Sequence, residues 1–372
     1  MKVIFFSNSC WSVYNFRINL IRTLLKKNFK IIVLAPFDGY EKKLSKIGCE
    51  VKKIKIQNNK VSIIADLILI INIFIKLFSH RKNSILLSFT IKPLIFGSLI
   101  SGFLKIPTVC MITGLGTIFI KKNFIKKIVL ILYKMAFKNV SYVLFQNKDD
   151  QRLFLNNNII KKKITILTPG SGVDIKKYSY KEQSYKKSTI FLLAARILKE
   201  KGIIEYIKAA KLIKKNKLKI KMNLVGSFVD NNKSSLPQRI IFNAHKNKVI
   251  NYLGFIDDIR NEIQKADCVV LPSYREGTPR FLLEGASMGR PIITTNVVGC
   301  KEVLRDNKNG FFCKVKDYKS LYLMINRFTN LNFNKKKKMS LYSRKFMVNN
   351  FDEKIVIGTY LKLINIIKKN ES

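Results

Sequence analysis

Two carboxylates, Glu276 and Glu284, lie in the segment of this chain that bears most directly on chemistry. Residues 271–284 predict a short buried strand, a loop and then a helix that begins near Pro279, with Thr278 as its cap. The loop would hold Glu276 beside the free amides of a helix N-terminus, which favours a phosphate group. Two carboxylates eight residues apart cannot both reach that phosphate from one helix face. The spacing therefore indicates hydroxyl ligands on either side of it, those of a sugar and a ribose.

Two cations, Arg196 and Lys201, follow another predicted strand. They stand in the loop after Ala194, and Gly202 precedes a helix that begins near Ile203. Arginine offers a planar fork for phosphate oxygens, and lysine offers a compact point charge. In a lysine-rich chain such residues are usually solvated surface, but their place at the carboxyl end of a strand favours a phosphate site.

The composition limits the kinds of protein that this chain can be. Its 372 residues, 47% of them hydrophobic, can build two α/β domains with cores of ordinary size. The formal charge of +47 favours polyanionic partners, namely nucleic acid, an anionic bilayer or phosphorylated ligands. Heavy use of Lys, Ile and Asn, as an AT-rich genome would give, accounts for about half of that excess. The longest lysine run, Lys335–Lys338, is short for a nucleic-acid-binding arm, so we expect no nucleic-acid partner.

The spacing of cysteines and histidines offers no metal site. The six cysteines are scattered without a C-x-x-C pair, and only His80 and His245 could join them. The opening apolar run Val3–Phe6 is too short for the core of a signal peptide. The sequence therefore predicts a cytoplasmic protein with reduced thiols.

Short apolar strands alternate with helical segments along the chain, which is typical of parallel, doubly wound sheets. The first half predicts strands at 3–6, 30–34, 50–54, 84–88, 107–112, 142–146 and 164–167. The second half predicts strands at 190–194, 219–225, 249–253, 268–271, 291–295 and 310–313.

We therefore predict an α/β fold with two doubly wound, Rossmann-like domains. The first covers residues 1–168 and the second residues 189–351, with a polar linker at 169–188. A helix at about 352–372 is expected to pack back on the first domain. Two such domains predict a ligand cleft between them, at the carboxyl ends of the strands.

Two helical segments bear on contact with a membrane. Residues 61–78 are apolar, but Asp66 and Lys76 would each make insertion into a bilayer costly, by about 2.5–3.5 kcal/mol. Because the polar residues of this segment fall within an arc of roughly 120°, we predict a core helix with a narrow exposed stripe. A helix lying on a membrane surface is the alternative. Residues 124–138 place four lysines opposite apolar residues, which fits either a basic helix on anionic lipid or an ordinary surface helix.

The segments around Glu276 and Arg196 together resemble glycosyltransferase family 4, whose members are retaining enzymes of the GT-B fold. The family's pattern of Glu, seven residues and Glu is matched by Glu276 and Glu284, and its Arg/Lys pair before a glycine by Arg196, Lys201 and Gly202. The resemblance extends over nearly the whole chain, with further agreement at Pro272-Ser273, Gly289–Thr295, Gly299–Glu302 and Asn309–Phe311.

The resemblance implies roles for these residues. In such enzymes the first glutamate contacts the transferred sugar, the second contacts the ribose, and the two cations neutralise the diphosphate leaving group. The implied catalytic residues are Glu276, Arg196 and Lys201. The implied donor-binding residues are Glu284, Gly277, Thr278, Pro279, Arg280, Gly226, Gly254 and Phe255. Two cations and a helix N-terminus would stabilise the departing diphosphate, and the sequence has no Asp-x-Asp motif, so no metal ion or other cofactor is expected.

The N-terminal half narrows the resemblance to the subgroup that builds bacterial lipid-linked oligosaccharides. The similar segments are Phe6–Arg17, Lys92-Pro93 with Gly97, and Gly114–Thr117. Members transfer N-acetylgalactosamine or a related hexosamine to an undecaprenyl-diphosphate sugar. This implies a UDP-sugar donor, a lipid-linked saccharide acceptor, and a peripheral place on the anionic inner face of the plasma membrane. The implied acceptor-binding residues are Ser12, Arg17, Lys92, Gly114 and Gly116, with Arg17 and Lys92 either meeting acceptor phosphate or serving as structural cations.

Two loops depart from the family pattern. Many members carry a Gly-Gly pair in the first loop and a histidine after the fifth strand, where this chain has Ser9–Ser12 and Thr113–Gly116. No general base can be named, so the leaving diphosphate would itself take the acceptor's proton. Two alternatives stay open. One is another GT-B enzyme such as a UDP-sugar 2-epimerase, whose acid and base residues we do not find, and the other is a nucleic-acid-binding protein, for which no motif is present.

Overall fold

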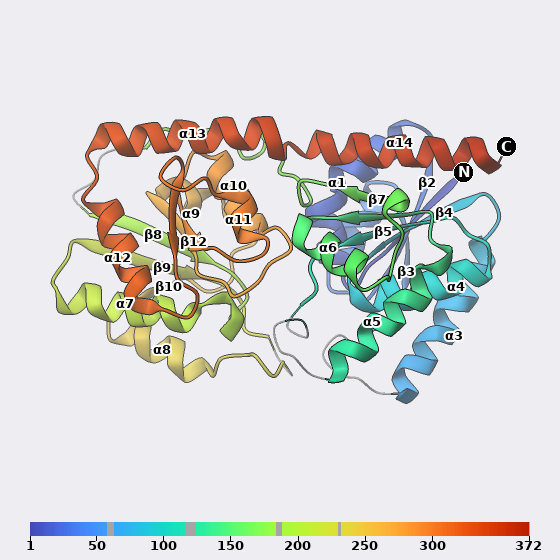
Figure 1. Ribbon diagram of the computed structural model, residues 1–372, viewed down its shortest axis with the longest axis horizontal. Coiled ribbons are helices and arrows are strands. Elements are labelled where there is room, and N and C mark those ends of the chain that lie inside the picture. Colours follow the sequence, from blue (N-terminus) through green and yellow to red (C-terminus); the bar gives the residue numbers. More distant parts are fainter. Residues whose placement is uncertain (58–62, 117–118, 120–123, 184–187, 230–231, 372) are drawn as a thin grey trace. The chain divides into compact units, whose positions relative to one another are not determined.

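The computed structural model describes residues 1–57, 63–116, 119, 124–183, 188–229 and 232–371. It divides into two compact units (Figure 1). Unit 1 contains Met1–Ser171 and Ile355–Ser372, and unit 2 contains Gly172–Lys354. Each unit is built on one all-parallel sheet with helices on both faces, so the predicted fold of two doubly wound α/β domains is confirmed.

Unit 1 has a seven-stranded sheet in the order β3-β2-β1-β4-β5-β6-β7. Its strands are β1 (Lys2–Phe6), β2 (Lys30–Ala35), β3 (Glu50–Lys53), β4 (Ser84–Phe89), β5 (Thr108–Ile112), β6 (Tyr142–Phe145) and β7 (Thr165–Leu167). Its helices are α1 (Cys10–Lys26), α2 (Glu41–Lys46), α3 (Ile63–His80), the π-helix η1 (Pro93–Gly97), α4 (Ser98–Phe103), α5 (Phe124–Ala136), η3 (Phe137–Asn139), α6 (Lys148–Asn156) and η4 (Lys162–Ile164). Alternate side chains of β1 enter the cores on opposite faces of the sheet, which explains why this strand is apolar throughout.

The last helix, α14 (Glu353–Glu371), belongs mainly to unit 1. It buries one side against residues of β1, β2 and α1, through Val356, Tyr360, Leu363, Ile364 and Ile367. This spacing of four, three, one and three residues is the stripe of an amphipathic helix. The C-terminal segment thus completes the core that the first strands of the chain begin.

Unit 2 has a six-stranded sheet in the order β10-β9-β8-β11-β12-β13. Its strands are β8 (Thr189–Ala194), β9 (Ile220–Val225), β10 (Asn251–Tyr252), β11 (Cys268–Leu271), β12 (Ile292–Thr295) and β13 (Gly310–Cys313). Its helices are η5 (Lys199–Lys201), α7 (Ile203–Lys215), α8 (Gln238–Lys246), α9 (Arg260–Lys265), α10 (Arg280–Ser287), α11 (Cys300–Val303), α12 (Tyr318–Thr329) and α13 (Phe333–Phe351). The strand order reverses between β8 and β11, and ligands of such sheets bind at the carboxyl ends of the strands beside that point.

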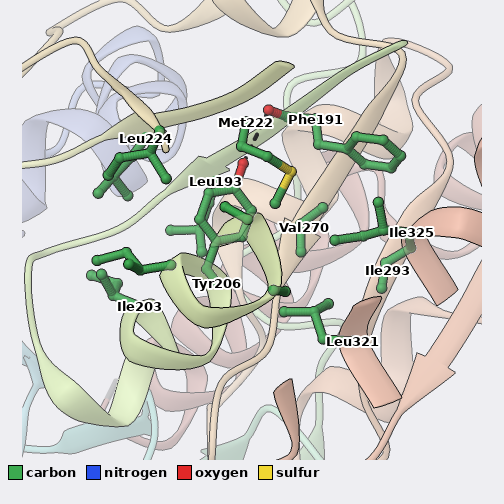
Figure 2. Packing of buried hydrophobic residues seen from close by; sticks show 14 of the residues in the cluster. Phe191, Leu193, Ile203, Tyr206, Met222, Leu224, Val270, Ile293, Leu321 and Ile325 are labelled. Carbon is green, nitrogen blue, oxygen red and sulfur yellow. Dashed lines mark hydrogen bonds between the residues drawn. The ribbon is translucent and has the colours of Figure 1, made fainter. Parts of the chain in front are cut away.

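The core on one face of this sheet fixes helix α7 (Figure 2). Ile203 and Tyr206 of α7 are fully buried against residues of β8, β9 and α12. The hydroxyl of Tyr206 lies 3.1 Å from the carbonyl oxygen of Phe191 and 2.9 Å from that of Asn223, so this buried polar group is satisfied. The start of α7, just after Lys201, is thereby held firmly on the sheet.

Helix α3 differs from its prediction. A core helix was expected, but only one row of its side chains, Leu69, Ile73 and Leu77, is buried. Asp66, expected on an exposed stripe, instead pairs with Lys92 at 2.5 Å, and both side chains are less than one-fifth exposed. The prediction is wrong because α3 is apolar on two sides, and periodicity alone cannot tell which of them packs on the sheet.

Part of the segment predicted as a linker, residues 169–188, packs on unit 2. Val173 and Tyr178 are buried in the core of unit 2. The amide of Val173 donates to the carbonyl oxygen of Phe351, 2.8 Å away. Together with the hydroxyl of Ser287, which donates to the carbonyl oxygen of Tyr178 at 2.7 Å, these contacts join part of the segment to unit 2.

Candidate active site

The loop that carries Lys201 is fixed against the loop that follows β11. Gly202 has a left-handed backbone, with φ at 73°, and a Cβ there would lie 2.1 Å from the carbonyl oxygen of Pro272. The carbonyl oxygen of Glu200 lies 2.9 Å from both the Ser273 hydroxyl and the Tyr274 amide nitrogen. Glycine is therefore required at 202 both for its backbone and for this close approach.

We expect Gly202→Ala to lower the free energy of unfolding of unit 2 by at least about 2 kcal/mol, because it adds a clash with the Pro272 carbonyl to left-handed strain. Gly254→Ala is the matched control, since Gly254 has φ at 72° but nothing within 4 Å of the added Cβ. It should cost only the strain, about 1–2 kcal/mol. Urea titration of both variants measures the difference, and equal losses would contradict the close approach.

Glu276 is the centre of the site. Its Oε1 atom lies 2.6 Å from the Lys201 Nζ atom and 2.7 Å from the Ser273 hydroxyl oxygen. The Lys201 and Glu276 side chains are 17% and 12% exposed, and the Glu276 amide donates to the carbonyl oxygen of Val298 at 3.0 Å. A lysine ammonium has three donors, so Lys201 can stay bonded to Glu276 while it binds an anion.

Arg196 lies on the same edge of the sheet, two residues after β8, but it does not join this cluster. Its side chain is exposed, and it forms no hydrogen bond or ion pair with the residues that the structure describes. The structure therefore brings Lys201 to Glu276 and leaves the Arg196 guanidinium in solvent.

Glu284 lies within α10 and is held by Arg280 from the first turn of the helix. The Arg280 Nε atom is 2.9 Å from Oε1 of Glu284, and its Nη1 atom donates to the carbonyl oxygen of Gly172 at 3.0 Å. Burial, aided by the charge of Glu284, raises the pKa of Tyr178 well above its ordinary value. The carboxylate of Glu284 thus has a fixed place next to an un-ionised phenol.

The start of α10 corrects one prediction. The helix begins at Arg280 with Pro279 in the cap position, and no side chain caps it, so Thr278 is not the N-cap. Gly277, Thr278 and Pro279 are all buried. Because proline has no amide hydrogen, it suits both the cap position and the first helical position. The helix can therefore begin one residue later than the sequence predicts.

The other predicted donor-binding residues lie at the ends of β9 and β10. A Cβ on Gly226 would meet the carbonyl oxygen of Ala195 at 1.9 Å, and the Gly226 amide donates to the carbonyl oxygen of Gly254 at 2.9 Å. Phe255 is 60% exposed. Loops after four adjacent strands of unit 2 therefore meet at one sheet edge, beside the reversal of strand order.

The predicted acceptor residues lie in unit 1. Ser12 donates to the carbonyl oxygen of Ser9 at 2.9 Å, in the first turn of α1. Gly114 and Gly116 follow β5 with φ at 122° and 67°. Lys92 follows β4 and is bound to Asp66, as described above. These four residues thus follow strands β1, β4 and β5, which are neighbours in the sheet.

Arg17, the fifth of these residues, is buried in unit 1. It is 6% exposed, and its guanidinium lies 4.7 Å from the centroid of the Phe89 ring. Its Nη1 and Nη2 atoms donate to the carbonyl oxygen of Phe16 and the sulfur of Met111, both at 2.9 Å. This placement favours the structural role that the sequence left open.

Two family models match the chain along most of its length. The model described as glycosyl transferases group 1 matches residues 174–346, and the glycosyl transferase 4-like model matches residues 2–147. The first covers the sheet and loops that hold Glu276, Lys201 and Glu284. The chain belongs to the glycosyltransferases that these two models describe. The family predicted from the sequence is thereby confirmed.

One curated relative of this glycosyltransferase aligns with the whole chain, and another aligns with most of it. It is 27% identical to the N,N'-diacetylbacillosaminyl-diphospho-undecaprenol alpha-1,3-N-acetylgalactosaminyltransferase of Campylobacter jejuni, with 100% of both chains aligned. It is 25% identical to the UDP-Gal:alpha-D-GlcNAc-diphosphoundecaprenol alpha-1,3-galactosyltransferase of Escherichia coli, over 78% of this chain and 77% of the relative. Among solved structures, Anabaena Alr3699/HepE in complex with UDP and glucose shares the fold, with a TM-score of 0.79 at 16% identity over 98% of this chain and 99% of that one.

Ser273 and Gly299 of this glycosyltransferase lie in segments that resemble the family, but no role in the site was predicted for either of them. A Cβ on Gly299 would lie 2.4 Å from the carbonyl oxygen of Gly277, so the loop before α11 packs directly on the loop of Glu276. Ser273 is fully buried with its hydroxyl on the Glu276 carboxylate. Its place three residues before Glu276, at the end of a predicted strand, was the signal that could have identified it.

One group of possible metal ligands occurs in the described part of the chain, formed by Cys10, Asp38 and Glu41 of unit 1. Both carboxylates already accept backbone hydrogen bonds, Asp38 from the Trp11 amide at 2.9 Å and Glu41 from the Gly39 amide at 2.9 Å. Burial raises the pKa of the Cys10 thiol to about 12. The group therefore serves as the cap of a turn and of α1.

Proposed function

We propose that this glycosyltransferase moves an N-acetylhexosamine from a UDP-sugar to a saccharide linked to undecaprenyl diphosphate, with retention of configuration and without a metal ion. The proposal places the enzyme on the cytoplasmic face of the membrane that holds this lipid. The observation that carries it is the contact between Glu276 and Lys201, which joins a carboxylate and a cation beside the reversal of strand order in unit 2.

The donor side of the proposal rests on unit 2. Lys201 and Arg196 would bind the diphosphate, Glu276 the hydroxyl groups of the sugar, and Glu284 the ribose. Gly226, Gly254 and Phe255 would line the nucleotide at the same sheet edge. UDP is the expected nucleotide because the Escherichia coli relative is named for a UDP-sugar and HepE was solved with UDP.

The chemistry follows from where charge develops. The bond between the anomeric carbon and the diphosphate oxygen breaks, and a bond from that carbon to the acceptor oxygen forms on the same face. The acceptor's proton passes to the departing diphosphate oxygen, so no separate protein base is needed. Two cations stabilise the growing negative charge, and a carboxylate stabilises the positive sugar ring.

The acceptor side of the proposal rests on the relatives and on unit 1. Both named relatives act on saccharides carried by diphospho-undecaprenol, and one of them aligns with the whole chain. Ser12, Lys92, Gly114 and Gly116 gather at the carboxyl ends of neighbouring strands of unit 1, where an acceptor would bind. An epimerase is less favoured, because the two histidines lie at the ends of α3 and α8, away from these strand ends.

The test is transfer of radiolabelled sugar from a panel of UDP-sugars to an undecaprenyl-diphosphate-linked saccharide in EDTA. We expect a labelled lipid with a UDP-N-acetylhexosamine and no loss of rate when EDTA replaces added magnesium. No labelled lipid with any UDP-sugar would overturn the proposed substrates. A rate restored only by metal would overturn the metal-free chemistry.

A further inference from the structure

Helix α3 presents an exposed apolar surface along four turns. Its members, which we call the α3 face, are Ile64, Leu67, Ile68, Ile71, Ile75 and Phe78, and each is between 45% and 73% exposed. At about 100° per residue they fall within an arc of roughly 100°. Single exposed apolar side chains are ordinary, but a continuous row of six marks an interaction surface.

The opposite side of α3 packs the helix on unit 1. Leu69, Ile73 and Leu77 are at most 2% exposed and pack in the same core as Phe6 of β1. The pair of Asp66 with Lys92 also lies away from the α3 face. Among the described residues α3 is the one helix long and apolar enough to cross a membrane. Its buried row on unit 1 and its exposed apolar row fit a helix that lies in the plane of a membrane surface.

Cations border the α3 face. The Arg81 guanidinium lies 3.8 Å from the centroid of the Phe78 ring, and Lys82 beside it is exposed. Both follow the last turn of α3. Arginine and lysine at the edge of an apolar row match a bilayer with anionic headgroups, which attract the cations while the acyl chains receive the apolar side chains.

The carboxylates near α3 do not offset these cations. Asp66 is bound to Lys92, and Glu50, the carboxylate whose charge acts on His80, is bound to Lys52 at 2.8 Å. Apolar rows also mark protein interfaces, but the charged side chains at this edge of the row are Arg81 and Lys82, which anionic lipid headgroups attract. Charge and chemistry therefore favour lipid as the occupant.

The neighbouring helices α4 and α5 also expose apolar side chains, and α5 exposes lysines beside them. In Figure 1, α3, α4 and α5 lie next to one another along unit 1, and α4 contacts both of the others. Phe103 of α4 is 75% exposed and its ring lies 6.1 Å from that of Phe74. On α5, Lys127 and Lys134 are exposed beside Ile131 and Met135, which are 59% and 58% exposed.

We propose that the α3 face inserts into the headgroup and upper acyl region of an anionic bilayer and docks unit 1 on the membrane. The inference rests on the proposed function for its purpose, since a lipid-linked acceptor is reached from that surface. Its physical basis, the exposed apolar row and its cations, is independent of the reaction.

The test is flotation of the full chain with vesicles of phosphatidylglycerol and phosphatidylethanolamine. We expect Ile64→Ser/Ile71→Ser/Ile75→Ser to weaken vesicle binding by about tenfold or more, with an unchanged thermal midpoint because all three side chains are exposed. The matched control is Val315→Ser/Leu323→Ser/Leu341→Ser, three exposed apolar residues of unit 2, and it should bind as the wild type does.

Equal vesicle binding by the α3 variant and the wild type would overturn the proposal. A wild type that ignores vesicles but forms a dimer that the α3 variant dissociates would overturn it too, in favour of a second copy as occupant. If vesicle binding depends on α3 but the protein transfers no sugar, docking is upheld and the proposed function is rejected. If the protein transfers sugar but binds vesicles independently of α3, the proposed function is upheld and docking by α3 is rejected.

Discussion

Glu276→Gln is expected to lower turnover by about 100-fold or more while the chain stays folded. Glutamine keeps the shape of the side chain and can still meet Ser273, but it removes the negative charge. Lys201 then loses its ionic partner at 2.6 Å, and the developing positive charge on the sugar loses its counter-charge. Turnover at saturating donor and acceptor, with the thermal midpoint measured alongside, checks the result.

Glu262→Gln is the matched control for this prediction. Glu262 is another glutamate of unit 2, 14% exposed and bound to Lys265 at 2.6 Å, but it lies on α9. If Glu276→Gln lost turnover only because an ion pair of a mostly buried glutamate is broken, Glu262→Gln would lose turnover alike. Wild-type turnover in Glu276→Gln would remove Glu276 from the catalytic centre.

Arg196→Ala is expected to lower turnover by about 100-fold or more, because it removes one of the two cations that we propose to bind the departing diphosphate. Its side chain is exposed and forms no hydrogen bond or ion pair with the described residues, so stability should not change. Lys199→Ala, an exposed cation three residues further along the same loop, is the control and should keep its activity. Steady-state kinetics of the two variants decide the matter, and equal turnover in both would show that Arg196 is ordinary surface charge.

The strands were predictable from the sequence because both faces of each sheet are covered. Continuous apolar runs such as Val3–Phe6 and Cys268–Leu271, bounded by turn residues and alternating with helical segments, favour buried parallel strands. Edge strands were less predictable, since β10 is reduced to Asn251 and Tyr252 where five residues were expected. A strand with a single neighbour has less burial to mark its ends.

The sequence named residues for the candidate site but not their contacts. Glu276 and Lys201 lie in loops after the neighbouring strands β11 and β8, and Glu284 lies in α10. The bond from Ser273 to Glu276 and the pairing of Lys92 with Asp66 depend on segments far apart in the chain or on a loop conformation, neither of which spacing reveals. Arg17 likewise has the residue type of a phosphate ligand, and only its burial against Phe89 favours a structural role.

Helix α3 shows the limit of periodicity most fully. Its polar residues were taken to mark the exposed side, yet the larger exposed surface is the apolar row opposite the sheet. A helix with two apolar sides satisfies both a protein core and a lipid surface, so its sequence alone favours neither.

The configuration of the new glycosidic bond tests the central claim most directly. The lipid-linked product of the wild-type enzyme, made in EDTA from a UDP-α-N-acetylhexosamine, would be released and examined by NMR beside the product of Glu276→Gln. We predict one added N-acetylhexosamine in α linkage from the wild type and only a trace from the variant. A β linkage, or equal product from both enzymes, would contradict the account of retention at Glu276.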